Sequence, residues 1–169
     1  HLSMCGIIIS KMNYFDRARY FRTKKRLGQN FLVDGEVIQD IIDFAQITPD
    51  DTVLEIGPGV GFVTEQLVKH AKKVIAIELD EEAIAELKKL EAPNLEIIHN
   101  DVLKTDLSNL TNEKFKVVAN IPYYITSPII AHLLGEIDDL ANKNRSQIKD
   151  IILMVQEEVA RRMVATPDS

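Results

Sequence analysis

Short apolar segments of strand length alternate with segments of helical periodicity along most of this chain. The expected strands cover residues 52–56, 73–78, 95–99, 115–121 and 150–156. The expected helices cover residues 35–45, 62–69, 80–90, 127–134 and 157–165, and Asp34 and Asp80 stand at the N-cap positions of two of them. Because the strands are apolar along their whole length, helices are expected to cover both faces of the sheet. The alternation therefore predicts an α/β fold with a mostly parallel sheet.

Length and composition are those of one soluble globular domain. The chain has 169 residues, of which 46% are hydrophobic and 27% are charged, enough for a single hydrophobic core. Cys5 is the one cysteine, so neither an internal disulfide nor a cysteine metal site is expected, which fits a reducing cytoplasm. No apolar run reaches the ~20 residues of a membrane-spanning helix.

The net charge of -6 is unevenly distributed. Residues 11–26 hold seven Lys or Arg and one Asp, a net charge of +6 that leaves -12 for the rest of the chain. Such a segment can contact phosphates, or it can be a solvated tail. Residues 1–26 are therefore assigned to a basic N-terminal arm. Residues 1–11 are expected to form no structural element and to be non-native, with Met12 as the natural start.

A glycine-rich turn follows the first expected strand, in Glu55-Ile56-Gly57-Pro58-Gly59-Val60-Gly61. Glycines between a strand and a helix let the backbone approach a ligand closely. The pattern is G-x-G-x-G, whereas a dinucleotide-binding turn usually reads G-x-G-x-x-G, which would place glycine at Phe62. The turn by itself is also compatible with a tight connection that binds nothing.

Acidic residues follow the next two expected strands. Glu78 ends the strand at 73–78, where a carboxylate can accept hydrogen bonds from both ribose hydroxyls of an adenosyl group. Asp101 follows the strand at 95–99, where it can accept a hydrogen bond from an adenine amino group. Taken singly, Glu78 is equally well a solvated acid at a strand end, and Asp101 a turn residue.

The fourth expected strand ends in Asn120-Ile121-Pro122-Tyr123. An adenine amino group is a poor nucleophile because its lone pair is delocalised into the ring. The Asn120 side-chain oxygen and the Pro122 carbonyl can accept its two hydrogens and localise that lone pair, and proline preorganises the carbonyl. Tyr123 can stack on an extruded base. A proline-terminated strand with core tyrosines is the alternative, and it is credible for Tyr124.

These four features all fall at the carboxyl ends of expected parallel strands, which is where ligands bind in open α/β sheets. Each has an alternative explanation alone, but their occurrence in this order predicts one shared site at that edge of the sheet.

The same motifs resemble the ribosomal RNA adenine dimethyltransferase family, in particular its bacterial small-subunit (16S-type) members. The resemblance covers roughly residue 17 to the end of the chain. It rests on the Glu55–Gly61 turn together with Leu27-Gly28-Gln29-Asn30-Phe31-Leu32, Ala76-Ile77-Glu78 with Asp80, Asn100-Asp101, Val118-Ala119-Asn120-Ile121-Pro122-Tyr123-Tyr124-Ile125-Thr126-Ser127-Pro128, and Met154-Val155-Gln156 with Glu158-Val159-Ala160.

The resemblance implies a Rossmann-like class I methyltransferase fold that uses S-adenosylmethionine. The cofactor-binding residues that it implies are Gln29, Asn30, Leu32, Gly57, Gly59, Gly61, Glu78, Asp101, Val102 and Asn120. The catalytic residues that it implies are Asn120, Pro122 and Tyr123. No metal is expected, because the methylated amine becomes acidic and can lose its proton without a strong base.

The implied reaction is the double methylation of two adjacent adenosines near the 3′ end of small-subunit rRNA during ribosome biogenesis. The implied partner is the pre-30S particle, and a cytoplasmic monomer that binds no membrane is expected. Family members continue beyond this point with two further strands and a helical domain. Residues 27–169 are therefore expected to be an incomplete catalytic domain, inefficient on rRNA, whose fifth strand is left as an exposed edge.

Three other functions remain open. The first is a large-subunit rRNA adenine methylase that confers macrolide resistance, although Gly57-Pro58-Gly59 and Ser127-Pro128-Ile129-Ile130 look more like the small-subunit type. The second is a non-catalytic RNA-, ribosome- or transcription-associated factor on the same fold, which an intact Asn-Ile-Pro-Tyr motif disfavours. The third is a nicotinamide-dependent oxidoreductase, which Phe62 disfavours.

Overall fold

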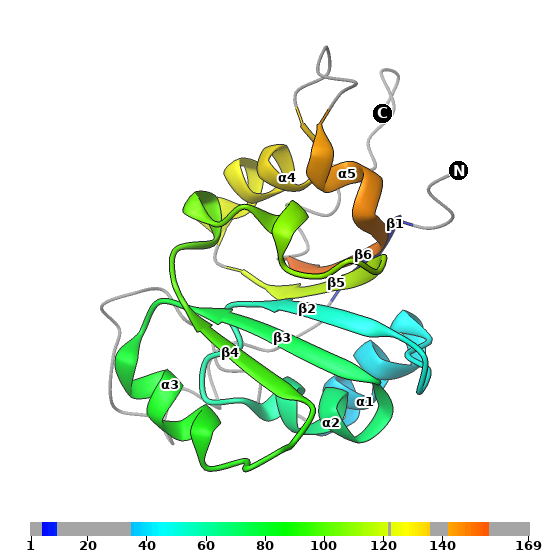
Figure 1. Ribbon diagram of the computed structural model, residues 1–169. Coiled ribbons are helices and arrows are strands. Elements are labelled where there is room, and N and C mark those ends of the chain that lie inside the picture. The colour runs from blue at the N-terminus through cyan, green and yellow to red at the C-terminus, as the bar shows by residue number, and fades with distance from the viewer. Residues whose placement is uncertain (1–4, 10–34, 122, 136–141, 156–169) are drawn as a thin grey trace.

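The computed structural model of the protein has a parallel sheet with helices on both faces (Figure 1). It describes residues 5–9, 35–121, 123–135 and 142–155. The strands are β1 (Cys5–Ile9), β2 (Thr52–Ile56), β3 (Lys73–Glu78), β4 (Leu95–His99), β5 (Phe115–Asn120) and β6 (Ile148–Val155). The helices are α1 (Gly35–Ala45), α2 (Phe62–His70), α3 (Glu81–Lys88), α4 (Thr126–Leu134) and α5 (Lys143–Gln147). Three short 3-10 turns are η1 (Val102–Lys104), η2 (Leu107–Asn109) and η3 (Tyr123–Ile125).

The strand order is β1-β6-β5-β2-β3-β4, and the described pairings are all parallel. From β2 the chain first builds outward to β3 and β4, and then crosses back to add β5 and β6 on the other side. The reversal of direction lies between β2 and β5. In open parallel sheets, the crevice at the carboxyl ends of strands beside such a reversal is the usual ligand site.

Side chains alternate between two cores because successive residues of a strand point to opposite faces. In β2, Leu54 and Ile56 belong to one buried cluster, which includes Ile129 and Leu133 of α4. Val53 belongs to the other cluster, which α1 and α2 cover (Figure 1). The α1 side chains in that cluster, Ile38, Ile41, Ile42 and Ala45, have the spacing of one helical face.

The expected α/β architecture is confirmed, and the element bounds differ little from those expected. The helix at 35–45 and the strands at 52–56, 73–78 and 95–99 match the expected ranges. Asp80 caps α3, since its side chain accepts hydrogen bonds from the backbone N–H groups of Glu82 and Ala83. The expected cap at Asp34 and the helix at 157–165 lie outside the described residues. Within the described part of the chain, every helix is too short or too polar to traverse a bilayer.

Two expectations about the edge of the sheet are wrong. Cys5–Ile9 forms strand β1, although residues 1–11 were expected to form no element. This strand pairs with β6 from Cys5↔Ile151 to Ile9↔Val155, so β6 is not the exposed edge that was expected. The reason is that the apolar, β-branched run Gly6-Ile7-Ile8-Ile9 suits a strand once a partner edge is present. That edge lies more than 140 residues away in the sequence, where local patterns give no signal.

Candidate functional site

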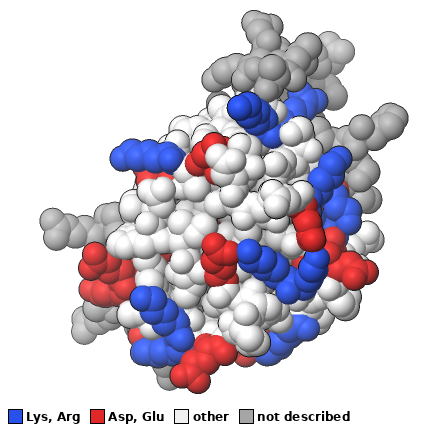
Figure 2. Space-filling model, viewed as in Figure 1, with Lys and Arg blue, Asp and Glu red and all other residues white. Residues whose placement is uncertain are grey.

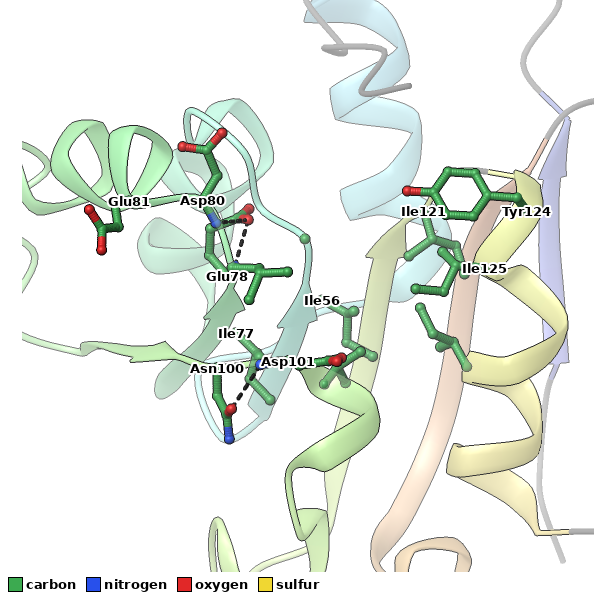
Figure 3. Close-up of a pocket in the computed structure, with 14 residues that line it drawn as sticks. Ile56, Ile77, Glu78, Asp80, Glu81, Asn100, Asp101, Ile121, Tyr124 and Ile125 are labelled. Carbon is green, nitrogen blue, oxygen red and sulfur yellow. Dashed lines mark hydrogen bonds between the residues drawn. The ribbon is translucent and has the colours of Figure 1, made fainter. Parts of the chain in front are cut away.

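A cavity of about 280 Å³ opens at the carboxyl ends of the strands, beside the reversal in strand order. Its walls come from the ends of β2, β3 and β5, the turn after β4, and the η3–α4 segment (Figure 3). The apolar lining residues are Ile56, Ile77, Leu79, Val102, Ile121, Ile125 and Ile129. The other lining residues are Gly57, Glu78, Asp80, Glu81, Asn100, Asp101 and Tyr124. Four of these carry a carboxylate, and none of the fourteen is basic.

Gly57 brings the glycine turn against the end of β5. It has a φ of +67°, a conformation that L side chains rarely adopt. Its N–H donates to the carbonyl of Ile77 at 3.0 Å, and a Cβ at this position would lie 3.8 Å from the carbonyl oxygen of Asn120. The turn and the Asn-Ile-Pro-Tyr segment, 63 residues apart, therefore meet at the cavity.

Gly61 has a different role from Gly57, because it does not line the described cavity. Its φ is +91°, and a Cβ there would lie 2.9 Å from Cδ2 of Leu87. Leu87 is fully buried in α3. The missing side chain of Gly61 thus lets α3 pack close to the start of α2.

Glu78 is held at the end of β3 by three backbone N–H groups. Its Oε2 accepts from Gly59 at 2.9 Å, and its Oε1 accepts from Leu79 at 2.7 Å and from Asp80 at 2.9 Å. The side chain is buried, yet it lines the cavity (Figure 3). A carboxylate offers about four acceptor positions, so these contacts orient the group and leave capacity on Oε2.

Asp101 follows β4, and both of its carboxylate oxygens have contacts in the turn η1. Its Oδ1 accepts from the N–H of Leu103 at 3.0 Å, which caps η1. Its Oδ2 lies 3.8 Å from Nζ of Lys104, and 29% of the side chain is exposed. The next residue, Val102, is buried against the cavity. Asp101 is therefore a turn residue, as one interpretation had it, and it also lines the cavity.

Asn120 lies at the last position of β5, opposite Met154 of β6, and is partly exposed. Ile121, the next residue, is buried and lines the cavity. Pro122 lies outside the described residues, and of Tyr123 only the backbone is described, as the start of η3. Tyr124 is 68% exposed and lines the cavity, so its interpretation as a core residue is wrong.

The structure gives Glu55 an unusual environment, although the sequence analysis quoted this residue in the glycine turn without giving it a role. It is buried in β2 and accepts a hydrogen bond from Oγ1 of Thr64 at 2.7 Å. Burial raises the pKa of Glu55 to about 8, against the lowering effect of the Thr64 hydrogen bond and with a further rise from the charge of Glu78. Its strand-end position next to the glycines was a usable signal, since a charged residue inside an apolar strand requires an explanation.

The remaining predicted site residues, Gln29, Asn30 and Leu32, lie outside the described residues together with most of the basic arm. Among the described residues, no three His, Cys, Asp or Glu side chains are grouped so that they could hold a metal ion. The arrangement that is described can accept hydrogen bonds from hydroxyl and amino groups and enclose an apolar ring.

Comparison with known proteins matches this chain to a known family. The family described as "Ribosomal RNA adenine dimethylase" matches residues 20–169. The chain is 47% identical over 155 residues to "Ribosomal RNA small subunit methyltransferase A" of Clostridium acetobutylicum, covering 88% of this chain and 52% of that protein. It is 46% identical over 157 residues to the protein of the same name from Bacillus pumilus, covering 88% of this chain and 51% of that protein.

Two solved structures share the fold. A dimethyladenosine transferase from Plasmodium falciparum has a TM-score of 0.65 at 36% identity, over 83% of this chain and 47% of that one. The 23S rRNA methyltransferase ErmE has a TM-score of 0.64 at 34% identity, over 78% of this chain and 50% of that one. The expected class I methyltransferase fold is confirmed. The chain spans about half the length of the curated relatives that it matches, and it belongs to the ribosomal RNA adenine dimethylase family.

Proposed function

We propose that this chain is the cofactor-binding part of an enzyme that transfers methyl groups from S-adenosylmethionine to the amino groups of two adjacent adenosines in small-subunit rRNA. The observation that carries the proposal is the meeting of Gly57, Glu78 and Asp101 in the lining of one cavity. The backbone of Asn120 lies beside Gly57, so the ends of four different strands come together there. The curated relatives at 46–47% identity are small-subunit methyltransferases by name.

The described residues fit S-adenosylmethionine in charge and in the placement of hydrogen-bond acceptors. Glu78 would accept hydrogen bonds from the ribose hydroxyls, with the backbone donors of Gly59 and Asp80 holding it in place. Asp101 would accept from the adenine amino group through Oδ2, with Val102 against the ring. The acidic lining favours a cationic sulfonium ligand over the pyrophosphate of a nicotinamide dinucleotide. A volume of about 280 Å³ is near the lower limit of about 300 Å³ for small-molecule pockets.

The bound cofactor would supply an electrophilic methyl group, and the chain would supply orientation. Asn120 would accept one hydrogen of the target amine through its side-chain oxygen, and the Pro122 carbonyl would accept the other. Tyr123 would stack on the target base once it leaves its neighbours. Well-oriented positioning of this kind contributes up to about 7–11 kcal/mol to a rate.

The proposed partner is small-subunit rRNA within the assembling particle, with the chain acting as a monomer in the cytoplasm. Residues 11–26, with a net charge of +6, would contact phosphates. On the face shown in Figure 2, basic and acidic side chains of the described residues are intermixed, so phosphate contacts are assigned to the arm rather than to this face.

A large-subunit target is the second candidate, because ErmE is 34% identical and carries the same fold. Transfer of tritium-labelled methyl groups to isolated ribosomal subunits separates the two. Labelling of small subunits is expected, and labelling restricted to large subunits would reverse the assignment.

The first test is a calorimetric titration of S-adenosylmethionine into the chain and into a Glu78→Ala variant. The variant is expected to bind more weakly by about 1–3 kcal/mol, because hydroxyl partners lose their acceptor. Glu113→Ala is the matched control, since Glu113 is exposed before β5 at the opposite end of the sheet.

Glu78→Gln separates lost contacts from lost structure, because it keeps the side-chain volume and one oxygen for the N–H groups of Leu79 and Asp80. An affinity between those of the wild-type chain and Glu78→Ala is expected. If circular dichroism shows a folded wild-type chain that does not bind the cofactor, the proposal fails for this chain.

A further inference from the structure

Exposed apolar side chains gather at the mouth of the cavity. Among the described residues, three large apolar side chains are exposed: Phe44, Leu79 and Tyr124. Two of these, Leu79 at 64% and Tyr124 at 68% exposure, line the same cavity. Large apolar surface beside a cavity marks a ligand-binding position more often than isolated exposure does.

Tyr124 projects from the wall opposite the acids. Figure 3 shows its ring extending from η3 with the hydroxyl directed toward the side of the cavity that carries Glu78. The acids and the phenol ring come from opposite sides of the reversal in strand order, β3 and β4 on one side and the segment after β5 on the other. A ligand held by Glu78 and Asp101 would therefore lie between them and Tyr124.

Buried residues flank Tyr124 on both sides along the chain, although its own ring is exposed. Ile121 precedes it and is 7% exposed, and Thr126 and Ile129 follow it at 3% and 2%. These neighbours anchor η3 between β5 and α4. An aromatic side chain has only two rotatable side-chain angles, so its ring can stack on a planar ligand at little cost in conformational entropy.

We propose that Tyr124 is a cofactor-binding residue whose ring packs against the adenosyl group of S-adenosylmethionine and forms the outer wall of the cavity opposite Glu78 and Asp101. The inference rests on the proposed function, because it needs the cofactor in this cavity. A purine ring between an aromatic face and the apolar lining loses contact with water on both sides. Aromatic stacking on a base is sequence-tolerant and strong enough to matter for affinity.

The absence of tryptophan from the sequence makes a direct test possible. In a Tyr124→Trp variant the new side chain is the sole tryptophan, and its emission is expected to change when S-adenosylhomocysteine or adenosine is added, but not with methionine. Phe44→Trp is the matched control, because Phe44 is 49% exposed on α1 and does not line the cavity. Its emission is expected to stay constant.

Calorimetry with S-adenosylhomocysteine measures the contribution of the ring. Tyr124→Ala is expected to weaken binding on the order of tenfold, and Tyr124→Phe, which keeps the ring, is expected to stay close to wild type. Because Tyr124 is exposed, both variants are expected to unfold at the wild-type temperature.

The outcomes separate this inference from the proposed function. Suppose that the wild-type chain binds S-adenosylhomocysteine, that Tyr124→Ala binds it with the same affinity, and that the emission of Tyr124→Trp stays constant. These results would overturn the role of Tyr124 and leave the proposed cofactor site intact. A tryptophan response to methionine but not to adenosine would overturn the assignment to the adenosyl group. Failure of the folded wild-type chain to bind would remove both.

Discussion

Glu55 shows how burial changes the chemistry of a single carboxyl group. It lies within β2, next to the glycine turn, with Thr64 of α2 as its hydrogen-bond donor. Burial is the main reason that its pKa rises to about 8, well above the ordinary value of 4.5. The folded chain therefore keeps a proton on Glu55 between these two values, whereas the unfolded chain releases it.

This difference makes stability depend on pH. The contribution of Glu55 is fully present below its unfolded pKa and is lost as pH rises toward its folded pKa, with a slope of up to about 1.4 kcal/mol per pH unit. A Glu55→Gln variant cannot ionise and is expected to remove this decline between about pH 4.5 and about 8. Urea unfolding at a series of pH values measures the effect.

Glu65→Gln is the control for loss of one carboxylate, because Glu65 is exposed on the neighbouring helix α2. Its stability is expected to follow the wild-type pH profile. Identical pH profiles for Glu55→Gln and the wild type would contradict the raised pKa.

Gly61 illustrates a packing requirement at one residue. Gly61→Ala places a Cβ 2.9 Å from buried Leu87 at a φ of +91°. We expect a loss of about 2–4 kcal/mol in unfolding free energy, from the left-handed backbone and the overlap together. Gly57 has a φ of +67°, but a Cβ there would lie at an ordinary distance of 3.8 Å from the carbonyl oxygen of Asn120. For Gly57→Ala we therefore expect a smaller loss in unfolding free energy, about 1–2 kcal/mol. Urea unfolding measures both variants. If Gly61→Ala and Gly57→Ala lose the same unfolding free energy, the contact with Leu87 is relieved without cost.

At the scale of elements, Lys116 joins β5 to the end of α1 and the start of β2. Its Nζ donates to the carbonyls of Ala45 at 3.0 Å and Gln46 at 2.7 Å, and lies 3.0 Å from Oδ2 of Asp51. Carbonyls at a helix C-terminus have no partner within the helix, so the ammonium satisfies them. Burial acts to raise the pKa of Asp51, but hydrogen bonds from Lys116, Thr48 and Lys149 outweigh it and hold that pKa below its usual range.

Removal of this ammonium tests the connection. Lys116→Met is expected to lower the unfolding free energy by about 3 kcal/mol, near the lower limit for breaking a buried ion pair, because Lys149 still pairs with Asp51. Lys72→Met is the matched control: the Lys72–Glu113 pair is half exposed, and about 0–1 kcal/mol is expected. Thermal and urea unfolding measure both, and equal effects would contradict a structural role for Lys116.

At the scale of the whole molecule, β1 decides which strand forms the edge of the sheet. Its five residues pair with Ile151–Val155 of β6. Without β1, β6 would present unpaired N–H and carbonyl groups along an apolar strand, and such an edge recruits other chains. Deletion of residues 1–9 is therefore expected to lower stability and to cause concentration-dependent association in light-scattering measurements.

Deletion of residues 1–4 leaves β1 intact and serves as the control, for which a monodisperse chain of wild-type stability is expected. If the longer deletion is equally monodisperse and stable, β1 does not protect the edge.

Much of the fold and part of the site follow from local patterns in the sequence. The strands β2 to β5 and the helix α1 have apolar segments that are continuous or of helical period, and the acids Glu78 and Asp101 stand directly after strands. The 3-10 turns and α5 were not predicted, because such short elements depend on capping contacts such as that of Asn142 with Arg145 rather than on periodicity.

The sequence by itself determined the alternation of strands and helices and the placement of polar residues at strand ends, because both depend on neighbours along the chain. Only the tertiary structure decided that β1 pairs with β6, that Gly61 faces Leu87, that Glu55 keeps a proton and that Tyr124 stands at the cavity mouth. Each of these depends on groups distant in sequence or on burial, and solvent exclusion is a property of the packed molecule rather than of any segment.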